Sequence, residues 1–183
     1  MFAKKREKTE LIVICDSRTS ARKNWGVQDI NRVAINAGAF SDSGPTGVHY
    51  VLPRNGTVGN GRLPAYIGQH IDGLDSRSVY IMLVGGMNPS ETAEKDTYTD
   101  GQMTALLGVV RLMLTKYPEA PVVPSGLVSA NSPGPSFDVL GWASEHIGTV
   151  NAERYRAYLD NKVDPSADMD LSFVRNPRDR MED

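Results

Sequence analysis

Residues 49–86, HYVLPRNGTVGNGRLPAYIGQHIDGLDSRSVYIMLVGG, set the architecture of this chain. They begin with a short strand-like run that ends at Pro53, because a proline nitrogen has no proton to donate to a β-ladder. Asn55-Gly56 tolerates positive φ at successive residues, so it predicts a tight hairpin between the short strands on either side of it. The apolar run 79–84 is rich in strand formers and predicts a buried central strand.

The chain outside this stretch alternates between strand and helix patterns. An unbroken apolar run at residues 11–15 predicts a central strand covered on both faces. The clearest helix is predicted over residues 100–117, where Thr99 and Gln102 form a capping box. Further patterns predict helices over 26–38 and 137–147, an edge strand over 121–124 and a loop over 125–135. The predicted fold class is α/β, with a central mixed β-sheet of about five strands flanked by helices.

Length and charge suggest one soluble domain with two tails. The 183 residues carry a net charge of −2, which gives no field favouring nucleic acid or a membrane surface. No apolar run approaches the ~18 residues of a membrane span, and no signal peptide precedes the domain, so we expect synthesis in a cytoplasm. We expect a basic arm over 1–10, the domain over 11–150 and an extension over 151–183. The candidate interaction residues of the two tails are Lys4, Lys5, Arg6, Lys8, Arg175, Arg178 and Arg180.

Four motifs stand in a fixed order along the chain: HYVLPRNGTVGNGR from His49, GQHIDG around His70, a strand ending in VGG, and PSFD at 135–138. In this order the chain resembles the type-2 N-acetylmuramoyl-L-alanine amidases, a family that includes the T-odd coliphage lysozyme and the peptidoglycan recognition proteins. The resemblance covers roughly residues 11–147. It implies an amidase-like fold with a cleft directed at peptidoglycan.

The same resemblance points to a missing metal site. The family holds zinc with a His at the end of the first strand, a second His after a late strand, and a Cys before PSFD. Here those places carry Ile14, Gly126 and Gly134, while the accessory Tyr and Lys are replaced by Val48 and Ser132. Zinc hydrolysis needs three protein ligands and an open position for water. The resemblance therefore implies a pseudoenzyme without a cofactor.

Three polar residues remain as candidates for the old cleft, beside Val48 and Ser132. Asp16 follows the first strand, where α/β folds place their sites, and we interpret it as a loop carboxylate that bonds nearby amides. His49 and His70 fall on family motif positions. We interpret both as cleft-wall residues that hydrogen-bond locally, and an improvised metal site is the alternative.

Loss of the zinc site with retention of the core predicts a structural component of a tailed-phage virion, bound to other virion proteins through its tails. Three alternatives stay open. The first is a peptidoglycan-binding module that does not cut, and the second is a regulator of phage RNA polymerase acting through the N-terminal segment. The third is an amidase with a non-standard site.

Overall fold

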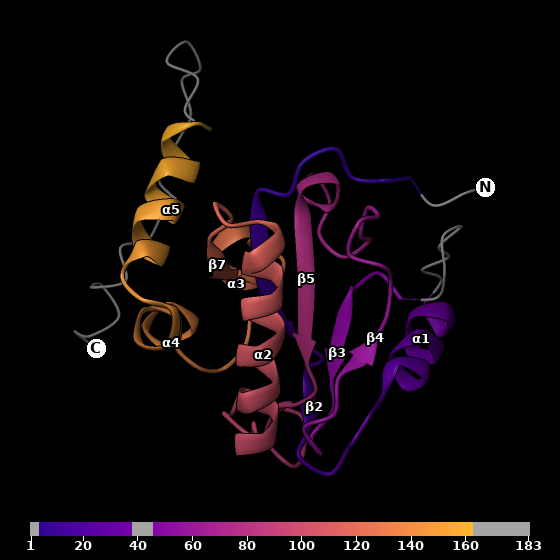
Figure 1. Ribbon diagram of the computed structural model, residues 1–183. Coiled ribbons are helices and arrows are strands. Elements are labelled where there is room, and N and C mark those ends of the chain that lie inside the picture. Colours follow the sequence, from indigo (N-terminus) through magenta and orange to yellow (C-terminus); the bar gives the residue numbers. More distant parts are fainter. Residues whose placement is uncertain (1–3, 38–45, 163–183) are drawn as a thin grey trace.

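The computed structural model describes residues 4–37 and 46–162. Its centre is a five-stranded sheet in the order β4-β3-β5-β1-β7 (Figure 1). The strands are β1 (Leu11–Asp16), β3 (Tyr50–Leu52), β4 (Gly59–Asn60), β5 (Ser78–Leu83) and β7 (Val122–Pro124). All neighbours are parallel except the antiparallel pair β3 and β4. The predicted mixed sheet of an α/β fold is therefore confirmed.

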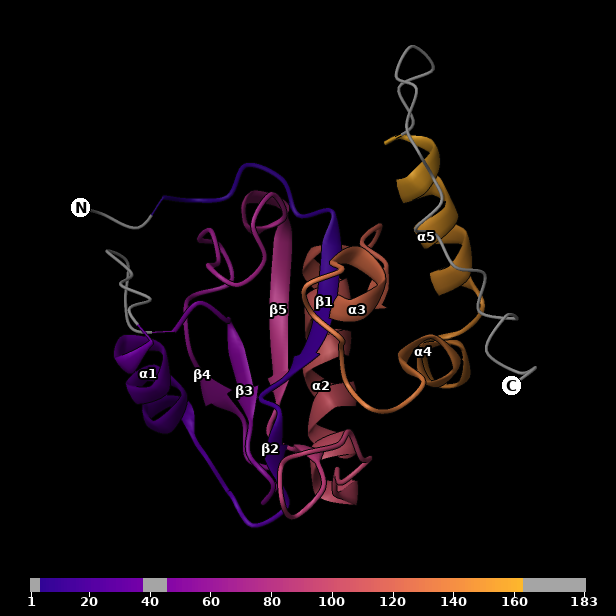
Figure 2. The same cartoon turned by 180° about the vertical axis from the view of Figure 1, so that it is seen from behind.

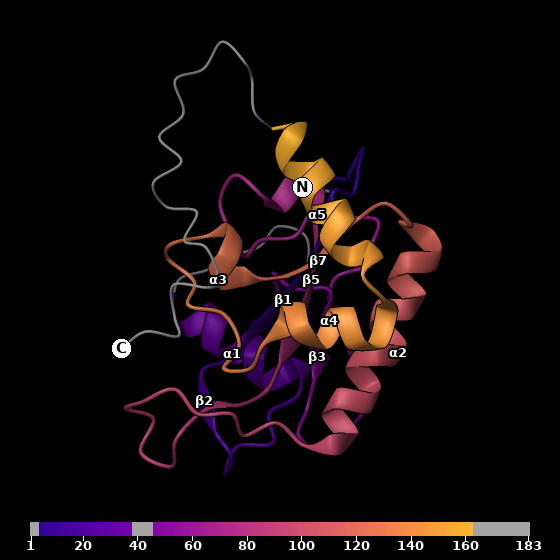
Figure 3. The same ribbon diagram turned by 90° about the vertical axis from the view of Figure 1, so that its left-hand side faces the viewer.

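Helices cover both faces of this sheet. The long helix α2 (Asp100–Lys116) lies on one face, and α1 (Val27–Asn36) and α3 (Ser125–Val128) lie on the other, as the side view in Figure 3 shows. The remaining elements are α4 (Val139–Ile147), α5 (Val150–Asp160), the 3₁₀ turn η1 (Asp75–Arg77), and a small sheet of β2 (Thr19–Ser20) and β6 (Gly86–Met87). Within the described residues, no helix is long and apolar enough to cross a membrane.

The apolar run of β1 is explained by its central place. Its side chains alternate between the two faces of the sheet. Ile12 and Ile14 pack in the cluster beneath α2, whereas Val13 and Cys15 pack in the cluster on the opposite face, with residues from α1 and α3 at its margin. Both faces of β1 are covered by apolar side chains and exclude water, so the residues on both faces are apolar.

A buried glutamine ties α2 to the sheet. The Gln102 side chain is fully buried, and its amide nitrogen donates to the carbonyls of Leu52 (2.8 Å) and Val84 (2.9 Å). Its side-chain oxygen accepts from the Thr99 amide, so the predicted capping box is confirmed. The amide therefore gives the Val84 carbonyl a donor and gives the Leu52 carbonyl a second donor, beside the Val84 amide at 3.0 Å.

Two local predictions differ from the structure. The hairpin after β3 is wider than a two-residue turn, because Val51 pairs with Gly59 and only Gly56 of the turn has positive φ. The Asn55 side chain closes the turn by accepting from the Thr57 amide at 3.1 Å. The predicted loop 125–135 instead begins with the short helix α3, which follows directly on the end of β7.

The described part of the N-terminal arm lies against the domain. Lys5 forms a β-bridge with Tyr66, and the Arg6 amide donates to the Ala65 carbonyl at 2.8 Å. The Arg6 guanidinium donates to the carbonyls of Pro64, Tyr66 and Ser78. The arm is thus partly folded onto the domain, and Arg6 is a half-buried anchor that holds it there.

The start of the C-terminal extension also belongs to the folded unit. The Asn151 side chain pairs with both backbone groups of Val122 on the edge strand, at 2.7 and 2.9 Å. The Asn151 amide thus hydrogen-bonds the backbone of the edge strand, as a further strand would. A boundary at residue 150 would cut through α5, which packs beside α4 (Figure 2). The tail candidates Arg175, Arg178 and Arg180 lie outside the described residues.

Candidate functional site

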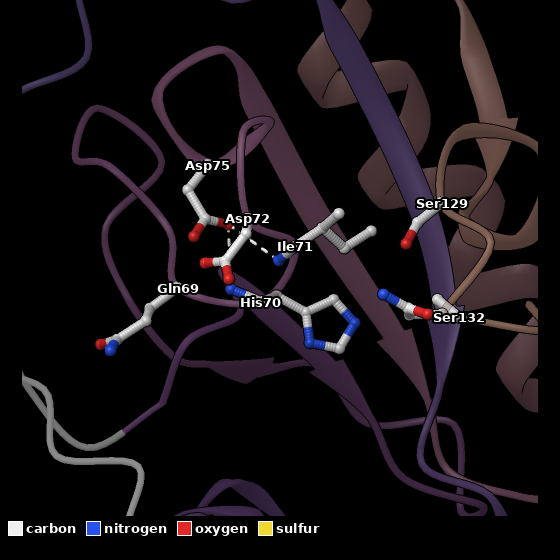
Figure 4. A pocket seen from close by; sticks show the side chains of 8 residues that line it. Gln69, His70, Ile71, Asp72, Asp75, Ser129 and Ser132 are labelled. Atoms are coloured by element: carbon white, nitrogen blue, oxygen red, sulfur yellow. Dashed lines mark hydrogen bonds between the residues drawn. The ribbon is translucent and has the colours of Figure 1, made fainter.

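A polar pocket opens between two loops, with a volume of about 300 Å³ (Figure 4). One wall is the loop that carries the GQHIDG motif, and the other is the segment after α3. The lining residues are Gln69, His70, Ile71, Asp72, Asp75, Ser129, Asn131 and Ser132. Of the residues predicted for the cleft, His70 and Ser132 meet here from opposite walls, and the His70 ring points toward Ser132.

The first wall is fixed by one carboxylate. Asp75 Oδ1 accepts from the amides of His70 (2.9 Å) and Ile71 (3.0 Å) and from the Tyr80 hydroxyl (2.8 Å). The His70 ring packs edge-on against Tyr80, with ring centroids 5.2 Å apart. Desolvation by the surrounding protein lowers the pKa of His70, and the nearby Asp75 opposes this shift. The shift favours the uncharged form of the ring.

The second wall is held by serine hydroxyls and backbone turns. Ser132 donates its hydroxyl proton to Ser125 Oγ at 2.8 Å, and Ser125 is fully buried at the start of α3. The Ser129 amide donates to the Ser125 carbonyl at 3.0 Å. Because the Ser132 proton points to Ser125, the lone pairs of Ser132 Oγ are left as acceptors.

His49 is a structural residue and does not line the pocket. It is 1% exposed, and its Nδ1 accepts from the Tyr80 amide at 2.9 Å. The proton is therefore on Nε2, which donates to the Tyr66 carbonyl at 3.0 Å. Burial lowers the pKa of His49 to about 4, so the ring is neutral. We predicted a cleft-wall histidine that hydrogen-bonds locally. Both ring nitrogens of His49 are hydrogen-bonded to the backbone, so neither is available to a metal, and His49 is not among the residues that line the pocket. Val48 is likewise buried in the core.

The residues at the zinc positions do not fit a zinc ion. Ile14 lies on the α2 side of β1, away from α3, because strand side chains alternate between faces. The residue at the end of β1 on the same face as α3 is Cys15. Its thiol is 1% exposed, and burial raises its pKa, which disfavours the thiolate that binds metals.

Backbone fills the space that the other two ligands would need. A Cβ at Gly126 would overlap the Pro133 carbonyl oxygen. Gly134 has φ +83°, a left-handed conformation that favours glycine, and a Cβ there would lie 2.9 Å from the Gly126 nitrogen. The described residues contain no group of three or more His, Cys, Asp or Glu side chains that could hold a metal ion.

Asp16 lies at the end of β1, away from the pocket. Its Oδ2 accepts from the Tyr98 hydroxyl at 2.9 Å, and the Tyr98 oxygen accepts from the Ser136 amide at 3.3 Å. Burial raises the pKa of Asp16 to about 6, although the hydrogen bond from Tyr98 opposes this. Asp16 thus joins β1 to the PSFD segment through the Tyr98 hydroxyl. From the sequence alone, the PSFD segment was recognised only as a motif.

We expect Asp16→Asn to stabilise the protein at neutral pH. A pKa that is higher in the folded state than in the unfolded state gives stability that is present below about pH 4 and is lost as the pH rises through 6. Asparagine mimics the protonated acid, so the variant should gain about 1–2 kcal/mol at pH 8 and little at pH 4. Urea denaturation at both pH values checks this, with Glu119→Gln as the control. An equal gain at both pH values would contradict the assignment to Asp16 titration.

Comparison with known proteins identifies the family. An endolysin of Enterobacteria phage K11 is 33% identical over 141 residues, which cover 77% of this chain and 89% of the relative. An endolysin of Escherichia phage T7 is 31% identical over 139 residues, covering 76% and 88%. The chain belongs to the phage endolysin family. This family is part of the type-2 amidase and peptidoglycan recognition protein superfamily, so the resemblance seen in the motifs is confirmed.

Solved structures of the superfamily share the fold. The Ph2119 endolysin from the Thermus scotoductus MAT2119 bacteriophage has a TM-score of 0.60 at 19% identity, covering 79% of this chain and 89% of that chain. A complex of the peptidoglycan recognition proteins LCa and LCx with tracheal cytotoxin has a TM-score of 0.60 at 14% identity, covering 78% and 86%. No family model matches the chain.

The endolysin relatives correct the first functional prediction. We expected a structural virion component. The curated relatives are endolysins, and this chain matches nearly the whole length of each of them, so that prediction is wrong. Its warrant was the loss of zinc ligands, and loss of ligands alone does not indicate a new role. The pocket residues Asp72, Asp75, Ser129 and Asn131 were missed by sequence reasoning. The GQHIDG motif was the only sequence signal for the first wall of the pocket. The second wall could not be assigned to the same site, because it comes from a segment about 60 residues away.

Proposed function

We propose that this member of the endolysin family binds peptidoglycan fragments in the pocket between the His70 and Ser132 loops, and does so without zinc-dependent amide hydrolysis. The observation that carries the proposal is a pocket of about 300 Å³ beside zinc positions that hold no donor atoms. Family membership supports the ligand class, since one structural relative is described in complex with tracheal cytotoxin.

The absence of zinc chemistry is argued from the side chains themselves. Glycine and isoleucine have no lone pair to offer a metal, and restoring a ligand at position 126 would require the Pro133 backbone to move. The nearby thiol of Cys15 is buried and protonated. A protein that keeps the cleft but lacks these donors retains binding without the metal-bound water that attacks the amide.

Hydrolysis by a different arrangement of residues is the second candidate. It is favoured by the curated relatives, all of which are described as endolysins. The polymerase-regulator alternative gains no support from the N-terminal contacts, because Arg6 is engaged within the domain.

Co-sedimentation with insoluble peptidoglycan tests the proposal. We expect the protein to pellet with the cell wall, and Ser132→Trp, which fills the pocket, to leave it in the supernatant. Glu119→Gln removes an exposed charge outside the pocket and serves as the control. Wild-type protein that stays in the supernatant would contradict binding.

Dye release from labelled cell walls, measured with and without a chelator, separates the two candidates. We expect no release under either condition. Release that survives the chelator would favour the second candidate. Release that the chelator abolishes and zinc restores would contradict the proposed loss of zinc chemistry.

A further inference from the structure

The pocket presents hydrogen-bond acceptors and negative charge. Two of its eight lining residues are carboxylates, and none is lysine or arginine. The pKa of its single histidine is lowered by desolvation, which disfavours the charged imidazolium. An anionic ligand group would therefore meet repulsion here and find no cationic side chain in the lining to pair with.

The two carboxylates differ in the number of hydrogen bonds and ion pairs that they make within the protein. Asp75 is held by three donors on one oxygen and is a support for the loop. Asp72 is exposed, and no ion pair joins it to another residue in the described part of the chain. Asp72 is thus the charge that the pocket leaves available to a ligand.

The facing wall supplies neutral acceptors. The Ser132 hydroxyl donates its hydrogen bond to Ser125 Oγ, so toward the pocket Ser132 Oγ can only accept. Ser129 and Asn131 add a hydroxyl and an amide on the same wall. An ammonium group has three donors and no acceptor, so it matches one carboxylate together with two neutral oxygens.

We propose that this pocket recognises a primary ammonium group, and that in peptidoglycan this group is the free side-chain amine of the stem-peptide diamino acid. The inference rests on the proposed function. Cross-linking converts this amine into an uncharged amide, which cannot pair with Asp72. The protein therefore prefers stem peptides that are not cross-linked through that amine.

Calorimetric titration with a soluble muramyl peptide tests the inference. One ligand carries the free side-chain amine, and the other is the same peptide acetylated at that nitrogen. We expect the acetylated peptide to bind about 10-fold more weakly or worse, since a charge-assisted hydrogen bond is lost. Asp72→Asn should weaken binding of the free amine by a similar factor and leave binding of the acetylated peptide unchanged.

Matched variants separate a charge contact from a general effect. Glu119→Gln removes one negative charge outside the pocket and should alter neither affinity. Raising the salt concentration should weaken binding of the free amine to the wild type and affect Asp72→Asn little. Because Asp72 is exposed, we expect Asp72→Asn to fold normally, which its melting curve checks.

The possible outcomes test the ammonium site separately from the proposed peptidoglycan binding. Equal affinity for the two peptides, with no effect of Asp72→Asn, would overturn the ammonium site and leave peptidoglycan binding intact. Failure of both peptides to bind, while the wild type also stays in the supernatant with insoluble peptidoglycan, would overturn the proposed function and this inference together.

Discussion

Gly47→Ala is expected to destabilise the protein by about 3 kcal/mol or more, because the added methyl group has no space. A Cβ at this position would overlap the carbonyl oxygen of Gln69, which belongs to the backbone and cannot rotate away. The Gln69 amide also donates to the Gly47 carbonyl at 2.8 Å, and this bond would be broken as the two segments separate. Urea denaturation followed by circular dichroism measures the loss.

This substitution should also impair the pocket. Gln69 begins the wall that continues through His70 to Asp72, so displacing its backbone moves the residues proposed to contact a ligand. Gly73→Ala is an informative companion, since no atom lies near the added Cβ and its cost comes only from φ +78°. If Gly47→Ala were as stable as the wild type, the close approach of the two segments would be refuted.

Gln102→Ala is expected to cost about 3 kcal/mol in the free energy of unfolding. The change removes the donor to the Val84 carbonyl and one of the two donors to the Leu52 carbonyl, and it leaves a cavity in the core. It also removes the acceptor for the Thr99 amide at the start of α2. Chemical denaturation should show a lower midpoint with an unchanged slope, as expected when stability alone is altered.

Leu112→Ala is the matched control on the same helix. Leu112 is 48% exposed, so truncating it should cost no more than about 0.5 kcal/mol. Alanine has the highest helix propensity, so neither variant should lose stability through propensity, and a similar loss for the two would contradict the role assigned to the buried amide.

The sequence by itself determined the class of fold and the family. The apolar runs of β1 and β5 have the pattern of central strands because both faces are dry, and the Thr99–Gln102 cap marks the start of α2. These signals are local in the sequence, so one sequence without an alignment is enough to recognise them. The lack of donor side chains at Gly126 and Gly134, where the resemblance places zinc ligands, is likewise a matter of residue type, because glycine has no side chain to coordinate with.

Only the tertiary structure decided which residues share a site. His49 and Asp16 resemble cleft residues by position, yet one is bonded on both ring nitrogens and the other faces Tyr98. Gln102 was expected only to cap a helix, and its second role depends on carbonyls that come from two separate strands. Long-range contacts of this kind leave no periodic pattern in the sequence.

The pocket shows the same limit. Asp72 and Ser132 come from loops far apart in the chain, and their meeting depends on how the sheet orders β5, β1 and β7. Sequence reasoning could read each loop as polar, but it could not tell that the two loops form opposite walls. The side on which a strand residue lies is also decided by register, which is why Cys15, and not Ile14, shares a face with α3.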